Sequence, residues 1–153
     1  MSALDDRIAS LGLTIPTAAT PAGAYTPALI SGNLVFTSGQ LPMVDGVLAG
    51  TGKVGADVTA EAAREYAATC ALNALAAVEL VIGSLDRVTR IVKVVGFVSS
   101  DPSFTGQPGV INGASELLGS IFGDSGVHAR SAVGVAVLPL DSPVEVELIV
   151  EFV

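Results

Sequence analysis

Two charged residues near the carboxyl end are the strongest candidates for chemistry. Arg130 opens a run of alternating character that continues to Leu138, and Glu145 lies near the start of a second such run. The planar fork of an arginine can donate two parallel hydrogen bonds to a carboxylate, and a glutamate can act as a general base. Mostly alanine and glycine share the strand face of Arg130, which leaves room for a small ligand. The competing interpretation is a surface arginine at the start of an edge strand.

The same two runs predict a β-hairpin. Residues 130–138 and 144–152 alternate between two faces, and the segment between them holds two prolines, an aspartate and a serine, which favour a turn. A turn centred near Asp141 would put Arg130 and Glu145 at opposite ends of the hairpin, roughly 20 Å apart at ~3.3 Å per residue. We therefore expect these two side chains to share a site only across a subunit interface.

This segment resembles the signature of a known family. The run Arg130-Ser131-x-Val133-x-Val135-x-x-Leu138-Pro139-x-Asp141-x-x-Val144-Glu145-Val146-Glu147 is similar to the C-terminal signature of the RidA/YjgF family, the reactive-intermediate (enamine/imine) deaminases. Upstream, Gly32-Asn33-Leu34-Val35-Phe36-Thr37-Ser38-Gly39-Gln40-Leu41-Pro42 resembles the N-terminal strand and loop of that family. The resemblance covers about residues 20 to 153, and two motifs in the right order make it fairly specific.

The resemblance implies both a fold and an activity. The fold is α+β, of the chorismate-mutase-like (bacterial) type, with a mixed sheet, two helices packed on one face, and sites between the subunits of a homotrimer. The activity is hydrolysis of a reactive 2-enamine or 2-imine acid to a 2-keto acid and ammonia, without metal or cofactor. Arg130 would hold the substrate carboxylate, and Glu145 of the neighbouring chain would position a water as general base.

Four more residues fall at positions where the family binds its ligand. Ser38 and Gly39 would contact the amine or carbonyl end, because a glycine permits backbone N–H groups to face a ligand. Tyr25 and Asn112 would close the pocket, with Asn112 in the first turn of a helix. Each also has an ordinary explanation: Ser-Gly in a turn, a half-buried tyrosine ring and an asparagine bonded to local backbone.

Three further residues, two of them near the second motif, need their own interpretation. His128, the only histidine, lies two residues before Arg130 on the same strand face and is a candidate acid–base group, although a solvated histidine at a strand entry is more common. Ala132 stands where many family members have a cysteine. Cys70, the only cysteine, lies on the packed side of a predicted helix and reads as a buried apolar residue.

The elements that position these residues follow from periodicity, caps and breakers. Ser2 caps a short N-terminal helix, an extended connector follows to about residue 20, and Thr59 and Gly83 bound the longest helix. Residues 43–57 are expected to be a loop, in which Lys53-Val54 could form a brief strand. Helices are predicted at 2–11, 60–82 and 110–122, and strands at 27–30, 34–38, 86–98, 130–138 and 144–152. This order predicts a single α+β domain over residues 1–153.

Composition limits the class of protein. Half of the 153 residues are apolar, 14% are charged and the mean hydropathy is +0.67, which indicates apolar surface buried between subunits. The net charge of −8, with seven basic residues, argues against a nucleic-acid partner. Neither a metal site, a signal peptide nor a membrane span is expected. The expected location is cytoplasmic.

Three other kinds of function can be compared with deamination at this stage. A non-catalytic trimer with the same Arg130 clamp could bind a 2-keto acid or similar small carboxylate and regulate a partner protein. Glu145 discriminates between the two, because an enzyme needs it for water and a binding protein does not. A ribonuclease, a label often attached to the family, fits poorly with the negative charge, and chorismate mutase rests on fold analogy alone.

Overall fold

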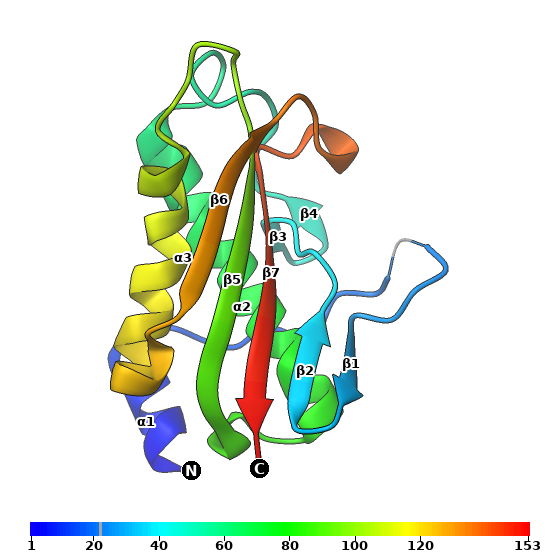
Figure 1. The fold of residues 1–153 in the computed structure, drawn as a ribbon, viewed down its shortest axis with the longest axis vertical. Coiled ribbons are helices and arrows are strands. Elements are labelled where there is room, and N and C mark those ends of the chain that lie inside the picture. The colour runs from blue at the N-terminus through cyan, green and yellow to red at the C-terminus, as the bar shows by residue number, and fades with distance from the viewer. Residues whose placement is uncertain (22) are drawn as a thin grey trace.

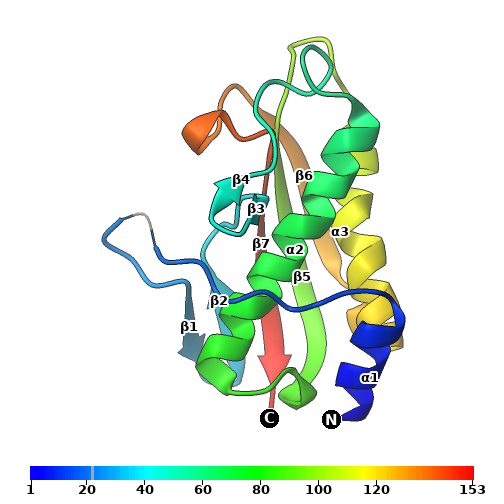
Figure 2. The ribbon, with the colours of Figure 1, turned by 180° about the vertical axis from the view of Figure 1, so that it is seen from behind.

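A five-stranded mixed sheet, covered on one face by helices, forms the body of the structure, a computed structural model that describes residues 1–21 and 23–153 (Figures 1 and 2). The strand order is β1-β2-β7-β5-β6. The strands are β1 Ala28–Ser31, β2 Leu34–Thr37, β5 Val88–Ser99, β6 Ala129–Val135 and β7 Val144–Phe152; the helices are α1 Ala3–Ser10, α2 Ala60–Ile82 and α3 Gln107–Phe122. Only β5 and β6 pair in parallel. The predicted α+β class with two helices packed on one face is confirmed.

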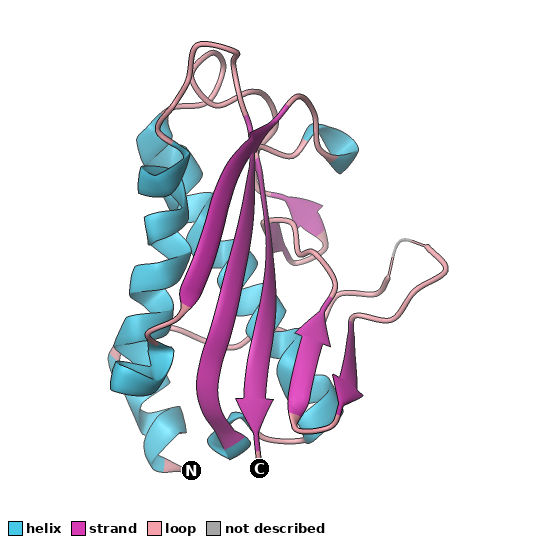
Figure 3. Cartoon of the chain, in the orientation of Figure 1, coloured by secondary structure: helices cyan, strands magenta, loops and turns pink. Residues whose placement is uncertain are grey.

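The N-terminal half follows the sequence pattern closely. Ser2 caps α1 in a full capping box, and the β1–β2 hairpin turns at the expected place. One prediction was wrong: residues 43–57 are not all loop, because Met43–Val44 (β3) and Val47–Leu48 (β4) pair as a small ribbon (Figure 3). Strands of two residues are too short to show a period of two in the sequence.

Helix α2 begins and ends as predicted, with the Thr59 hydroxyl accepting from Ala62 N–H and Gly83 in the left-handed conformation at φ 86°. Alanines on its buried side let it approach the sheet closely. By length and composition α2 is apolar enough to cross a membrane, with a window hydropathy of 1.4, yet 56% of that window is buried within the structure. Its apolar composition therefore builds the core.

The predicted hairpin between residues 130–138 and 144–152 is wrong. β6 pairs with β5, and β7 pairs with β5 and β2, so β5 lies between the two strands. The connection from β6 to β7 passes over the end of β5 and contains the 3₁₀ turn η3, Pro139–Asp141 (Figure 1). Alternation along two antiparallel runs is the same whether they are neighbours or separated by one strand.

Register along β5 gives the sheet two different faces. Arg130 lies opposite Val94, whose side is buried under the helices, whereas Glu145 lies opposite Phe97, on the face that no helix covers. The uncovered face carries apolar residues on all five strands: Leu29, Phe36, Val95, Phe97, Val133 and Ile149. Leu29, Phe36 and Val133 are 52%, 38% and 44% exposed. The same face also carries Glu145, Glu147 and Lys93, so it is mixed. An uncovered sheet face that exposes several large apolar side chains is typical of an interface.

Helix α3 starts three residues earlier than predicted, at Gln107, so Asn112 lies in its second turn. Pro108 in the first turn is compatible with helix because its missing N–H has no intrahelical partner there. α3 packs tightly on β5 at Gly96, where a Cβ atom would come within 2.4 Å of Ile111. This contact fixes the height of α3 above β5 and β6.

Candidate functional site

Arg130 is held by α3 from across the sheet face. Its Nη1 donates to Asn112 Oδ1 at 2.7 Å and to Ser115 Oγ at 3.2 Å, and its Nη2 donates to the carbonyl of Pro108 at 3.3 Å. Arg130 does lie near the start of an edge strand, β6, as the competing interpretation has it, but its side chain is half-buried and bonded at three points. Asn112, which was predicted to close the pocket, accepts a hydrogen bond from Arg130 itself.

These bonds leave part of the guanidinium available. Arginine has five N–H donors, and Nη1 uses both of its own while Nη2 uses one. Within the described residues, Nε and the second N–H of Nη2 have no acceptor. Donors on those two nitrogens are enough for the two-bond fork that binds a carboxylate.

His128 and Ser115 continue this network. Ser115 Oγ lies 2.8 Å from His128 Nε2, and His128 Nδ1 lies 2.6 Å from the carbonyl of Gly126. The interpretation of His128 as a solvated residue at a strand entry is thus not correct. Ser115 was missed from the sequence, although it lies three residues after Asn112 and therefore on the same side of α3.

Glu145 and Gly39 form a second group, at the junction of β2 and β7. A Cβ atom on Gly39 would lie 2.0 Å from Glu145 Oε1, so the carboxylate rests directly against the glycine backbone. The need for glycine here is close approach and not backbone conformation, because Gly39 has no positive φ. Its N–H donates to no described residue.

The Glu145 carboxyl has an altered acidity. Burial raises its pKa above the ordinary glutamate value, and the nearby charge of Glu147 raises the pKa further. A carboxylate of this kind takes a proton more readily than an exposed one near neutral pH. Cys70, by contrast, is fully buried and its thiol pKa is raised well above the ordinary value, in agreement with a purely apolar role.

Ser38 was predicted to contact a ligand, but both of its hydrogen-bond donors are used within the chain. Its hydroxyl donates to the carbonyl of Thr26 at 2.6 Å, and its backbone N–H donates to the carbonyl of Pro27 at 2.8 Å. Both donors are used, so only lone pairs of the hydroxyl remain for a ligand. Ser38 therefore holds the segment that leads to Tyr25.

Tyr25 and Gly39 line a common pocket of about 120 Å³. Most of its wall is apolar, with contributions from Pro27, Leu41, Met43 and Leu140, while Gln40 adds an amide; residues 19–21 of the N-terminal connector close one side. Tyr25 itself is half exposed. The connector thus contributes to the space beside Gly39, a role that its composition alone did not indicate.

Asn73 supports this pocket from within α2. Its buried amide donates to the carbonyls of Leu41 and Met43, each at 3.0 Å. A buried amide on an otherwise apolar helix side needs partners. An asparagine in an alanine-rich run is therefore a sequence signal that α2 holds a loop in place.

Within one chain the two groups do not meet. Arg130 and Glu145 flank β5 with three residues of offset and point to opposite faces. At ~3.3 Å per residue and ~4.8 Å per strand spacing their Cα atoms are about 14 Å apart, closer than the 20 Å of the incorrect hairpin. The predicted residues therefore divide into Arg130 with Asn112, and Glu145 with Gly39 and Tyr25.

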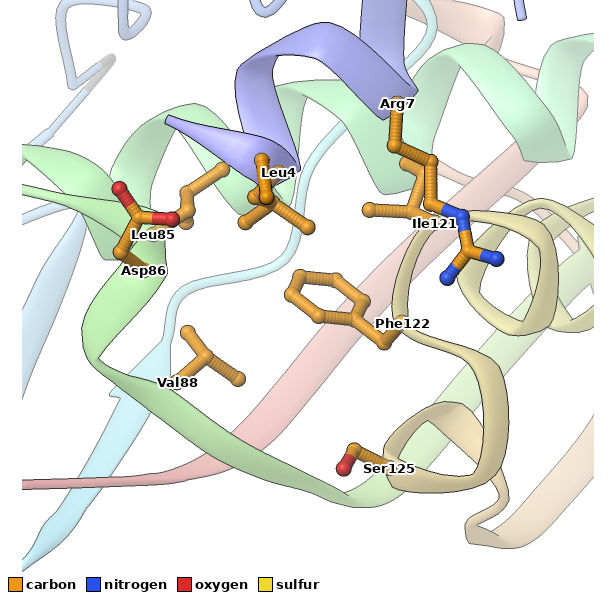
Figure 4. Close-up of a pocket in the computed structure, with 9 residues that line it drawn as sticks. Leu4, Arg7, Leu85, Asp86, Val88, Ile121, Phe122 and Ser125 are labelled. Atoms are coloured by element: carbon orange, nitrogen blue, oxygen red, sulfur yellow. The ribbon is translucent and has the colours of Figure 1, made fainter. Parts of the chain in front are cut away.

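A third region is hollow but holds none of the predicted residues. A cavity of about 330 Å³ lies beneath α1, where Leu4, Leu85, Val88 and Phe122 surround the space and Arg7 and Asp86 lie on opposite sides (Figure 4). No group of three or more His, Cys, Asp or Glu side chains that could hold a metal occurs among residues 1–21 and 23–153.

Comparison with known proteins gives close relatives. The chain is 46% identical over 142 residues to Protein TCP17 of Trypanosoma cruzi, covering 92% of this chain and 89% of that protein. The crystal structure of Atu1372 from Agrobacterium tumefaciens, a protein of unknown function, shares 46% identity with a TM-score of 0.91, covering 98% of this chain and 92% of that one. More distantly, TdcF of E. coli with bound serine shares 25% identity with a TM-score of 0.61, covering 91% and 94%.

A family model supports the same assignment over almost the full length. The model described as "YjgF/chorismate_mutase-like, putative endoribonuclease" matches residues 5–152. Both sequence motifs noted above, around Ser38 and around Arg130, fall inside this match. The chain therefore belongs to the YjgF/chorismate-mutase-like family, the RidA/YjgF family of the sequence comparison.

Proposed function

We propose that this protein hydrolyses reactive 2-imino and 2-enamino acids to 2-keto acids and ammonia, at sites between the subunits of a homotrimer. The observation that carries the proposal is the state of Arg130. Three bonds to α3 hold its guanidinium, and donors on Nε and Nη2 stay open. That arrangement suits a small carboxylate, which the two open donors can bind side by side.

Assembly would join the two half-sites. β6, which carries Arg130, is an edge strand, and the uncovered sheet face that carries Glu145 exposes the apolar side chains of Leu29, Phe36 and Val133. Packing the edge of one subunit against the uncovered face of the next would bury that surface and bring Arg130 toward the partner's Glu145 and Gly39. The trimer itself is an inference from the family.

The chemistry needs positioning more than a strong catalyst, because the C=N carbon of an imine is already electrophilic. Arg130 would bind the carboxylate, and the free N–H of Gly39 would face the imine end. Glu145 would take a proton from a water whose oxygen bonds to the imine carbon and deliver that proton to the nitrogen, which gives a neutral carbinolamine; in the next step the hydroxyl proton moves to the nitrogen. The C–N bond of the resulting carbinolamine then breaks, releasing ammonia and leaving the keto group.

Two observations bear on the substrate. The relative TdcF was crystallised with serine, in which one carbon carries both the carboxylate and the nitrogen, as in a 2-imino acid. The pocket beside Gly39 is mostly apolar, and Glu145 and Glu147 lie nearby. We expect apolar or small side chains to be preferred over acidic ones. The proposed location of this activity is the cytoplasm.

The second candidate is binding without turnover. The open donors of Arg130 and the N–H of Gly39 would hold a 2-keto acid with no role for Glu145. A trimer of this kind would act as a regulator of a partner protein. Ribonuclease activity, which the family description mentions, is disfavoured by the net charge of −8, since phosphate binding requires clustered basic residues.

The deciding experiment measures ammonia and keto-acid release from freshly generated 2-aminoacrylate or 2-iminobutanoate. Wild type should exceed the spontaneous rate, and Arg130→Ala and Glu145→Gln should return it to that rate. If wild type only matches the spontaneous rate yet binds pyruvate, the binding protein is correct. Cleavage of RNA that survives Arg130→Ala would contradict both.

A further inference from the structure

The hydrogen bonds beyond Arg130 form one continuous chain of donors and acceptors. Arg130 Nη1 donates to Ser115 Oγ at 3.2 Å, Ser115 Oγ lies 2.8 Å from His128 Nε2, and His128 Nδ1 lies 2.6 Å from the carbonyl oxygen of Gly126. The chain runs from β6 to α3, back to the residue before β6, and ends on the 3₁₀ turn η2, Gly123–Gly126.

The direction of this chain follows from its two ends. A carbonyl oxygen can only accept, so His128 Nδ1 carries the proton in that bond. In the neutral imidazole Nε2 is then an acceptor, and the Ser115 hydroxyl must donate its proton there. This leaves the lone pairs of Ser115 facing Arg130, whose N–H groups can only donate. Every member therefore has a partner that complements it.

We infer that His128 and Ser115 are positioning residues that set the orientation of the Arg130 fork. Nη1 has two N–H groups, and Ser115 and Asn112 accept one each. With both bonds in place the guanidinium plane is fixed and its Nε and Nη2 donors face one direction. With the Ser115 bond lost, Asn112 and the long contact to Pro108 remain, and the fork can tilt. This inference depends on the proposed role of Arg130 as a carboxylate clamp.

The support for Arg130 comes from the helix side. Asn112 and Ser115 lie one helical turn apart on α3, and the tight contact at Gly96 holds that helix at a fixed height. His128 in turn orients the Ser115 hydroxyl, whose rotor would otherwise be free to donate elsewhere.

Two substitutions of His128 separate its two bonds. In His128→Gln the side-chain amide reaches the position of Nε2 and its oxygen can accept from Ser115. In His128→Asn the shorter amide reaches the position of Nδ1 and can donate to Gly126, but nothing accepts from Ser115. A matched pair at the next residue is Ser115→Thr, which keeps the hydroxyl, and Ser115→Ala, which removes it.

The test is the dissociation constant of pyruvate by titration calorimetry, with pyruvamide as the ligand that lacks the carboxylate. We expect His128→Asn and Ser115→Ala to weaken pyruvate binding about 10- to 150-fold, the range for one lost hydrogen bond to a charged group. His128→Gln and Ser115→Thr should stay within about twofold of wild type. Pyruvamide affinity should not change. In turnover, the loss should fall on KM and not on kcat, since the carboxylate contact is the same in ground and transition states.

A second measurement tests the hydrogen-bond series from Arg130 to Gly126 without any ligand. Because His128 is the only histidine, the protein has a single pair of imidazole nitrogen NMR signals. We expect these signals to show the proton on Nδ1. A proton on Nε2 would overturn the inference, as would wild-type affinity for pyruvate in His128→Asn with wild type binding normally. Wild type that fails to bind pyruvate at all would instead remove the clamp itself, and with it this role of His128.

Discussion

The Glu145 carboxyl shows how one residue is tuned by its surroundings. Burial and the charge of Glu147 raise its pKa, so the ionised form is less favourable in the folded chain than in the unfolded one. The folded state is accordingly favoured most below the ordinary glutamate pKa, and this contribution is lost as the pH rises through the raised value. This cost in stability serves the chemistry, because a more basic carboxylate is a better proton acceptor.

We therefore predict that the rate falls on the acid side at a pH above that expected for an ordinary glutamate. Glu147→Gln removes the second cause of the shift and should move this limb to lower pH without abolishing activity. Glu145→Gln should remove the limb together with the activity. The measurement is the pH profile of kcat/KM, which reports groups of the unliganded protein, for the three proteins. A limb that stays in place in Glu147→Gln would contradict the assignment.

At Gly39 the prediction concerns space. A methyl group there would lie 2.0 Å from Glu145 Oε1, and the whole carboxylate arm would have to move. We expect Gly39→Ala to lose about 10²-fold in kcat, within the range for a displaced general base, while far-UV circular dichroism stays unchanged. Gly119→Ala is the matched control, since nothing lies within 4 Å of its added carbon. Equal activities of the two variants would show that Glu145 acts elsewhere.

Residue types and motif spacing identified Arg130, Glu145, Gly39 and Asn112 as candidates, because their chemistry is visible in single letters. Their partners were not visible. Ser115 contacts Arg130 only because α3 crosses above β6, and the commitment of the Ser38 hydroxyl to Thr26 depends on how one loop folds back. Such contacts are properties of tertiary packing, which the local pattern does not encode.

Elements were predicted well where their ends carry signals. Thr59 and Gly83 marked α2, and Ser31-Gly32-Asn33 marked the first hairpin. The pairing of β6 with β7 was predicted wrongly, because both strands neighbour β5 and the eight residues 136–143 are enough to pass over its end. The parallel β5–α3–β6 unit places α3 directly over Arg130.

The seating of α3 on β5 gives a prediction at the scale of the element. A Cβ on Gly96 would lie 2.4 Å from Ile111, so Gly96→Ala must lift α3 or force Ile111 into another rotamer. We expect a loss of about 1–3 kcal/mol in the free energy of unfolding, as for an overpacked core. Urea denaturation measures it. Ile111→Ala removes all three side-chain atoms that the added Cβ would meet, so Gly96→Ala should cost little stability when it is made in an Ile111→Ala background.

For the whole molecule, composition indicated buried surface between subunits, and the uncovered sheet face supplies a place for it. Phe36 and Val133 are exposed on that face in one chain. We predict that Phe36→Glu prevents assembly and yields a smaller, inactive species in size-exclusion chromatography with light scattering. Val44→Glu, at an exposed residue on β3 away from this face, is the control and should leave the assembly intact.

Sites shared between subunits can be tested by complementation. Arg130→Ala and Glu145→Gln chains should each be inactive alone, because every interface then lacks one of the two groups. Co-expressed in equal amounts, they should recover about a quarter of the wild-type activity, the share of interfaces that combine two intact halves by random assembly. No recovery in mixed assemblies of confirmed composition would contradict a site made from two chains.

The position of Arg130 and Glu145 on opposite sides of β5 has a consequence for how activity depends on closure. In the proposed assembly each chain contributes Arg130 to one site and Glu145 to another. In the proposed assembly, an open pair would complete one site and leave two halves idle at its ends. Closing the ring with a third chain would add two sites at once. Specific activity should therefore rise steeply with protein concentration until rings form, and then become constant.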